Sequence, residues 1–170
     1  MIFRALNLWR RKEEKRSLSQ RFMDTALLYS GTKYGWGKEN LQEVDCSGLV
    51  SGAFILNGFP IRTTANEFLT KFFTIKTDMK FEDDKVKAIF FVAKENYNTP
   101  SGDRLAGYAR HVGLLVGDGV IFSAVNPYAK FERIDTIEDR YDSSDMIVRE
   151  LDWNAVVNDG GKYAFDPDLQ

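Results

Sequence analysis

Val44-Asp45-Cys46-Ser47-Gly48-Leu49-Val50 is the stretch from which the rest of the chain can be placed. Aspartate is a favoured helix N-cap, so this stretch predicts a helix that begins at Asp45. The apolar positions that follow share one helix face, and Asn57-Gly58 is a suitable C-terminal stop before Pro60. The single cysteine of the chain therefore lies in the first turn of a predicted helix.

The elements on either side of this helix indicate an α+β fold. Upstream, the apolar spacing predicts a helix over 18–29, followed by a glycine-punctuated loop over 31–37. Downstream, Gly117-Asp118-Gly119 is a strong hairpin signal between two runs of strand formers. Helices followed by antiparallel strands are typical of α+β proteins, here with N-terminal helices packed on a central antiparallel sheet. The other elements that we expect are a short helix over 65–72, strands over 86–92, 111–116, 120–125 and 146–151, and a long polar connection over 94–110.

Length and composition predict one folded domain. The chain has 170 residues, of which 44% are hydrophobic and 14% aromatic, which is enough for a sizeable core. It contains no internal repeat and no Pro/Gly linker, and no apolar stretch reaches the roughly 18 residues that span a bilayer. We therefore expect a basic N-terminal arm over 1–17, a single domain over 18–170 and no integral membrane segment.

Charge is unevenly distributed along the chain. Residues 1–21 hold seven Lys/Arg against two Glu, whereas the remainder holds 16 Lys/Arg against 23 Asp/Glu. Such an arm is suited to weak contact with an anionic surface, and a solvated, frayed helix end is the alternative interpretation. We expect no nucleic-acid partner.

The N-terminus and the cysteine count bear on compartment and cofactor. Arg4 precedes only a short mixed stretch, and a charged cluster follows without a small-residue cleavage site, which is unlike a signal peptide. The sequence as it stands predicts a cytoplasmic protein, or one that a phage or a secretion system delivers to the cell wall. One Cys rules out an internal disulfide, and one Cys with one His argues against four-ligand zinc, so we expect no metal and no cofactor.

Cys46 is a candidate nucleophile because of its position. Free N–H groups and the positive end of the helix dipole favour a thiolate at a helix N-terminus, and the same N–H groups can hold an oxyanion. Its small neighbours Ser47 and Gly48 leave room for a substrate backbone. The alternative interpretation is a buried cysteine that acts as a small hydrophobic residue.

His111 is the single histidine and begins a predicted strand. A thiol nucleophile needs a base, and a Cys early on a helix with a His on a later strand is the papain-type arrangement. A structural histidine, in the core or at the surface, is the alternative. The sequence thus supplies one candidate for each catalytic role.

Three segments together resemble the NlpC-type cell-wall cysteine peptidases. The first joins Tyr34-Gly35-Trp36-Gly37 to the Asp-Cys-Ser-Gly-Leu-Val motif around Cys46. The second is Pro60-Ile61-Arg62-Thr63-Thr64, and the third runs from Arg110-His111-Val112-Gly113 to Phe122. The resemblance covers roughly residues 18–130. It implies a papain-like fold and hydrolysis of peptide or isopeptide bonds in peptidoglycan stem peptides.

The resemblance also implies roles for individual residues. Cys46 attacks the carbonyl, and His111 takes the thiol proton and later protonates the leaving amine. The N–H of Cys46 contributes to the oxyanion site, with Tyr34 beside it. Asp45 and Ser47 help to bind the free amine of the stem peptide, for which a carboxylate is suited, although Asp45 as an N-cap alone is a compatible alternative. Arg62 is a candidate substrate-binding residue, or else a salt-bridging surface residue.

One position departs from the family pattern. The polar residue expected about twelve positions after the catalytic histidine is usually His, Asn or Gln, and here that register falls on Ser123. Serine can accept a hydrogen bond from the imidazole but is short, and Asn126 is the alternative third catalytic residue. The departure leaves two further hypotheses open: an inactive binding or structural module, for example in a phage tail, and an acyltransferase or amidase on the same scaffold.

Overall fold

The computed structural model describes residues 16–163, so the predicted arm lies almost wholly outside the described residues. The helical elements, in chain order, are α2 (Leu18–Leu27), α3 (Cys46–Leu56), α4 (Ala65–Glu67), the π-helix η1 (Phe68–Phe72), the short 3₁₀ helices η2 (Ile134–Thr136) and η3 (Glu138–Tyr141), α5 (Trp153–Asp159) and η4 (Gly160–Tyr163). The strands are β1 (Lys33–Tyr34), β2 (Glu43–Val44), β3 (Ile75–Lys76), β4 (Lys87–Ala93), β5 (Tyr97–Thr99), β6 (Gly102–Arg104), β7 (Ala109–Gly117), β8 (Val120–Ala124), β9 (Ala129–Arg133) and β10 (Ser144–Glu150).

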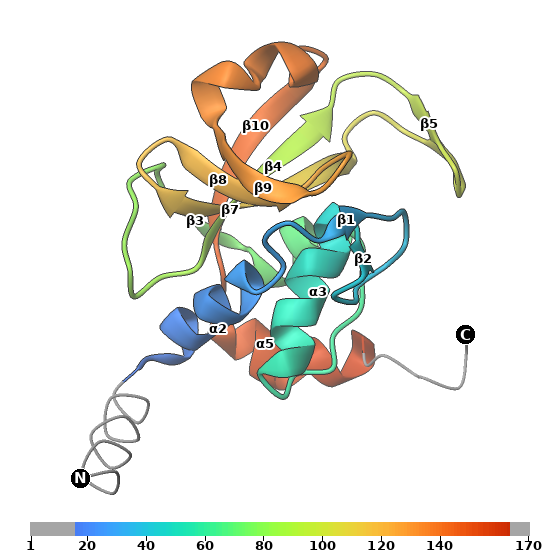
Figure 1. The fold of residues 1–170 in the computed structure, drawn as a ribbon. Helices are drawn as coiled ribbons and strands as arrows, with labels where there is room; N and C mark the ends of the chain where they lie inside the picture. The colour runs from blue at the N-terminus through green and yellow to red at the C-terminus, as the bar shows by residue number, and fades with distance from the viewer. Residues whose placement is uncertain (1–15, 164–170) are drawn as a thin grey trace, which may run out of the picture.

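A six-stranded sheet organises the molecule. Its strand order is β3-β10-β4-β7-β8-β9, and all the pairings in it are antiparallel. Helices α2, α3 and α5 lie against one face, and η2 and η3 cover the other (Figure 1). The predicted α+β class and its central antiparallel sheet are confirmed.

Two hydrophobic clusters fill the space on the two faces of the sheet. The larger one lies between the sheet and the helices, where the Phe22 and Phe54 rings meet edge to face at 4.8 Å. The smaller one joins strand residues such as Ile89 and Leu115 to Ile134 and Ile137 of the covering segment. Because both faces are covered, β4 and β7 are buried along most of their length and read as continuous apolar runs.

Helix α3 is held in the core by two close approaches that require glycine. A Cβ at Gly48 would lie 1.8 Å from the carbonyl oxygen of Lys38, and one at Gly52 would lie 1.9 Å from the Tyr29 hydroxyl. That hydroxyl donates to the carbonyl of Glu39 at 2.9 Å. The glycines therefore let the Tyr29 side chain, just after α2, and the loop before α3 pack directly on the backbone of α3.

Most predicted elements are present, and the differences are local. The helix expected over 65–72 is α4 followed by a π-helix turn, closed by a Phe73 N–H to Phe68 carbonyl bond of 2.8 Å. The polar connection over 94–110 contains the β5–β6 hairpin. Strand β9 and helix α5 were not predicted.

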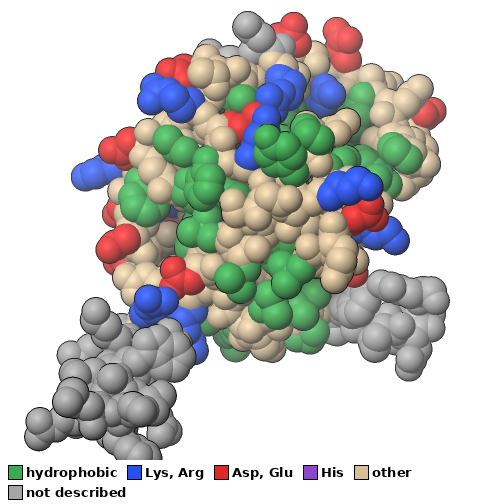
Figure 2. All heavy atoms as spheres, in the orientation of Figure 1, with side chains coloured by type: hydrophobic (Ala, Val, Ile, Leu, Met, Phe, Trp, Pro, Cys, Tyr) green, Lys and Arg blue, Asp and Glu red, His purple; other side chains and the backbone are tan. Residues whose placement is uncertain are grey.

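The surface is mixed in character. On the face drawn in Figure 2, basic and acidic side chains are interspersed, and hydrophobic side chains form separate clusters. Within residues 16–163, no helix is both long enough and apolar enough to cross a membrane.

Candidate active site

Cys46 is the first residue of α3, and the predicted N-cap residue is confirmed. Asp45 is extended, and its Oδ1 accepts from the Gly48 N–H at 2.6 Å. Its other carboxylate oxygen accepts from the Gly37 N–H at 2.6 Å, which ties the preceding loop to the helix. Cys46 is thus fixed at the tip of a buried helix, and the residue as a whole is of intermediate burial.

Cys46 and His111 line the same pocket, which has a volume of about 360 Å³. The backbone N–H of Val112, next to the histidine on β7, lowers the pKa of the Cys46 thiol. Helix α3 and strand β7 also pack against each other. The two candidate catalytic residues predicted from sequence therefore line one pocket.

Burial dominates the protonation of both groups. It raises the pKa of the Cys46 thiol to about 12, with the Asp45 carboxylate adding to the rise, against the lowering effect of N–H groups of Val112, Ser47 and Cys46. Burial also lowers the pKa of His111 to about 4. The acidic thiol expected from the helix tip is not found, because desolvation exceeds the effect of the helix N–H groups. Both shifts favour a neutral thiol beside a neutral imidazole.

His111 is held by aromatic rings on the face of the sheet opposite the helices. It pairs with Phe91 of β4, and the two rings lie 5.6 Å apart. Tyr141 of η3 stacks on the imidazole at 5.2 Å with an interplanar angle of 18°, and stacks on Phe91 at 4.0 Å. These contacts fix the plane of the imidazole without a hydrogen bond.

No hydrogen bond joins His111 to either candidate for the third catalytic position among the described residues. His111 is 6% exposed and Ser123 1%, and neither His111 Nε2 nor Ser123 Oγ has a hydrogen-bond partner among the described residues. Continuing the β7–β8 register from Leu114↔Phe122 places Ser123 opposite Gly113, on the same face of the sheet as His111. Asn126 is exposed and lines a second cavity, of about 390 Å³, together with His111.

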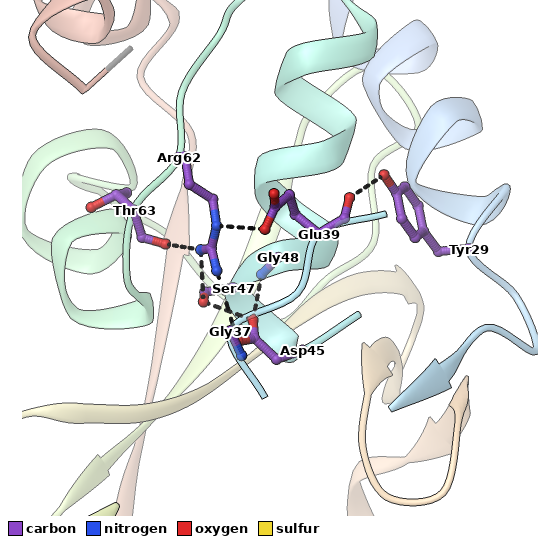
Figure 3. A network of polar contacts seen from close by, with 8 residues as sticks. All are labelled: Tyr29, Gly37, Glu39, Asp45, Ser47, Gly48, Arg62 and Thr63. Atoms are coloured by element: carbon purple, nitrogen blue, oxygen red, sulfur yellow. Dashed lines mark hydrogen bonds and ion pairs between the residues drawn. The ribbon is translucent and has the colours of Figure 1, made fainter. Parts of the chain in front are cut away.

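A polar network surrounds the helix tip, as Figure 3 shows. The Arg62 guanidinium lies 3.1 Å from Glu39 Oε2 and 3.9 Å from Asp45 Oδ2, and donates to the Thr63 carbonyl at 2.9 Å. The Ser47 hydroxyl donates to Asp45 Oδ1 at 2.9 Å. Arg62 is therefore a salt-bridging residue here, and both oxygens of Asp45 are engaged.

The predicted substrate-binding residues lie in the same pocket as the two candidate catalytic groups. Its lining includes Tyr34, Asp45, Ser47 and Arg62. Burial raises the pKa of Tyr34, and a negative charge on Cys46 or Asp45 raises it further, so its hydroxyl stays protonated and can donate a hydrogen bond in the pocket. Among the described residues, no cluster of three or more His, Cys, Asp or Glu could hold a metal ion.

Sequence reasoning missed several residues of this region. The β5–β6 hairpin forms one side of the pocket, to which it contributes Tyr97, Ser101 and Arg104. Its polar character and length were visible in the sequence, but its pairing was not. Nothing in the sequence indicated that Tyr141 would stack on the histidine.

Comparison with known proteins identifies the family. The sequence model of the NlpC/P60 family matches residues 31–148, which is more than half of the chain and includes both candidate catalytic residues. The chain belongs to the NlpC/P60 family. This assignment confirms the resemblance found in the three sequence segments.

Relatives of this NlpC/P60 chain cover it to different extents. A dipeptidyl-peptidase 6 from Lysinibacillus sphaericus is 42% identical over 45 residues, which are 26% of this chain and 17% of that protein. The NlpC/P60 domain of the peptidoglycan hydrolase SagA has a TM-score of 0.50 at 17% identity, and the match covers 79% of this chain and 97% of that one.

Two further structures share the fold over 78% of this chain. One is a lipoprotein-like NLP/P60 protein from Staphylococcus aureus, with a TM-score of 0.53 at 23% identity. The other is NlpC1 from Trichomonas vaginalis, with a TM-score of 0.51 at 20% identity. This chain spans only 40% and 42% of their respective lengths. The shared architecture is therefore that of one domain within longer proteins.

Proposed function

We propose that this protein is a cysteine peptidase that hydrolyses peptide or isopeptide bonds in peptidoglycan stem peptides. The observation that carries the proposal is that Cys46 and His111 line one pocket, where the Val112 N–H lowers the pKa of the thiol. Family membership and the peptidoglycan hydrolase among the structural neighbours support the substrate class.

The first half of the proposed reaction forms a thioester. His111 accepts the thiol proton as the Cys46 sulfur bonds to the substrate carbonyl carbon, which gives a tetrahedral oxyanion. The N–H of Cys46 and the Tyr34 hydroxyl are the proposed donors to that oxyanion. Collapse breaks the carbon–nitrogen bond, and the leaving amine takes the proton from His111.

Water completes the cycle. His111 accepts a proton from water as the hydroxyl attacks the thioester carbonyl, and collapse releases a carboxylic acid and the thiolate, which recovers its proton from the imidazolium. We assign the base to Nδ1, because Nε2 is buried without a partner. A neutral imidazole, which the burial of His111 favours, is the form that this base requires.

A free amine on the substrate would meet the Asp45 side of the pocket. Asp45 presents a carboxylate to the pocket, and its ion pair with Arg62 is long, at 3.9 Å. An ammonium group could take a place beside Asp45 and Ser47 without the removal of Arg62.

Hydrolysis of purified muropeptides by wild-type protein and by Cys46→Ala tests the proposal. We expect the wild type to release a new amine and the variant to lose this activity by several orders of magnitude, since the nucleophile is gone. Thermal unfolding of both proteins controls for folding. Equal release by the two proteins would refute the proposal.

The unpartnered His111 Nε2 and Ser123 Oγ favour a second candidate, an inactive binding module. Such a module would bind muropeptides without cleaving them. Intact-protein mass spectrometry with iodoacetamide separates the two candidates. A catalytic Cys46 is alkylated faster in the wild type than in His111→Gln, whereas an inactive site shows the same slow rate in both.

A further inference from the structure

The β5–β6 hairpin lines the pocket that contains Cys46. It projects from the sheet (Figure 1). Tyr97, Ser101 and Arg104 line the same pocket as Cys46 and His111. The Trp36 indole N–H donates to the Ser101 hydroxyl at 3.0 Å, which fastens the hairpin tip to the loop before α3. The hairpin is therefore placed to contact whatever occupies the pocket.

Two cations of the pocket have no acidic partner among the described side chains. Arg62 is compensated by Glu39 and Asp45, whereas neither Arg104 nor Arg110 forms an ion pair with a carboxylate that the structure describes. Arg104 donates only to the carbonyl of Asp103 at 3.0 Å, and Arg110 only to the Ser143 hydroxyl at 3.1 Å. Each guanidinium has five N–H donors, so most of them are free for a ligand.

Tyr97 joins the two arginines into one cluster. It is directly opposite Arg104 in the hairpin register, and the Arg110 guanidinium carbon lies 5.3 Å from the centre of its ring. Burial raises the pKa of Tyr97, both arginines lower it, and the charge of Cys46 raises it. The hydroxyl is thus protonated and within electrostatic reach of the sulfur.

We propose that Arg104, Arg110 and Tyr97 form a carboxylate-binding subsite, which selects substrates that carry a free carboxylate on a residue flanking the cleaved bond. The planar guanidinium fork matches a carboxylate, and two such forks with a phenolic donor provide more charge-assisted hydrogen bonds than a neutral group could use. Asp45 lines the same pocket, so the two together would orient a peptide with an amine at one point and an acid at another. This inference rests on the proposed function.

Paired peptides test the subsite. Each pair consists of a stem-peptide fragment with a free carboxylate and the same fragment with a carboxamide in its place. In one pair this group is on the residue before the cleaved bond, and in the other pair it is on the residue after that bond. Binding is measured by calorimetry to the Cys46→Ala protein, where no turnover occurs, and kcat/KM is measured with the wild type. We expect the carboxylate form of one pair to be preferred by about tenfold to a hundredfold, as one or two charge-assisted hydrogen bonds allow.

Variants assign that preference to the cluster. Arg104→Gln and Arg110→Gln should each reduce the carboxylate-to-carboxamide ratio by about tenfold, while Arg133→Gln, on the distant strand β9, should leave it unchanged. Thermal unfolding checks that each variant folds. No preference in either pair, no binding of either carboxylate peptide, or a ratio unaffected by both substitutions would overturn the subsite. A preference in binding without hydrolysis by the wild type would instead reject the peptidase and leave the subsite standing.

Discussion

At the residue scale, burial links the protonation of His111 to folding. A histidine titrates near pH 6.5 in an unfolded chain, whereas burial lowers the pKa of His111 to about 4, with Arg140 and Arg110 adding to the fall and Glu132 opposing it. Between these values the unfolded chain binds more protons than the native fold. The contribution of His111 to stability is therefore complete above pH 6.5 and is lost as the pH falls toward 4.

This linkage predicts that the unfolding free energy depends more steeply on pH in the wild type than in His111→Gln. Over the two and a half pH units concerned, the wild type should lose about 3 kcal/mol of unfolding free energy that the variant does not lose. Urea unfolding of both proteins from pH 7 to pH 4 measures the difference, and carboxylates that titrate in both proteins cancel. Parallel pH curves would show that His111 is not desolvated in the native state.

Ser123 is a candidate positioning residue, because it shares a sheet face with His111 and its hydroxyl has no partner there. Aromatic stacking already holds the imidazole, so we expect Ser123→Ala to lower kcat by no more than about tenfold, which is the value of one neutral hydrogen bond, and to leave KM unchanged. Steady-state kinetics on muropeptides measure both constants. The opposite pattern, with kcat kept in Ser123→Ala and lost in Asn126→Ala, would assign the role to Asn126.

The positions of individual site residues could be predicted where a local motif determines them. Properties that depend on tertiary packing could not. The Asp45 N-cap, Cys46 at the helix tip and His111 on a strand all follow from local patterns. The high pKa of the thiol does not, because desolvation depends on segments far away in the sequence. Stacking of Tyr141 on the histidine depends on such segments too.

At the element scale, Gly48 determines how closely the loop before α3 approaches the helix. A methyl group there would lie 1.8 Å from the Lys38 carbonyl oxygen, which accepts the Asp45 N–H at 2.9 Å. We expect Gly48→Ala to lower the unfolding free energy by about 1–3 kcal/mol and to reduce turnover, because the loop that carries the N-cap must move.

Gly161→Ala is the matched control for this substitution. A methyl group at Gly161 meets no atom within 4 Å, so its effect should stay within about 0.5 kcal/mol. Chemical denaturation compares the two variants with the wild type. Equal unfolding free energies of Gly48→Ala and Gly161→Ala would mean that the loop before α3 can move without loss of stability.

Elements with strong periodicity were predictable, and short or edge elements were not. Strands β4, β7, β8 and β10 were expected within two residues of their observed ends. Strand β9 alternates charged and apolar residues at the edge of the sheet, where only one neighbour pairs with it, and its apolar signal is correspondingly weak. Helix α5 has seven residues, too few for a clear helical period.

At the scale of the whole molecule, the pocket is assembled from segments that are distant in sequence. The loop before α3, the α3 tip, the Arg62 segment and the start of β7 were each marked by a motif, and their convergence follows from the family fold. The β5–β6 hairpin carries no such motif, so the cations that it brings to the pocket could be found only from the structure.

In the proposed reaction Cys46, with His111 as its base, becomes covalently attached to the substrate. The most direct measurement is mass spectrometry of protein quenched in acid within milliseconds of mixing with muropeptides, followed by mapping of the peptide that contains Cys46. We expect an added mass on Cys46 equal to the acyl part of the substrate. The adduct should be present during turnover, disappear when the substrate is exhausted, and be absent in His111→Gln. Turnover of muropeptides with no adduct on Cys46 at any time, and at the same rate in Cys46→Ala, would contradict the proposed reaction.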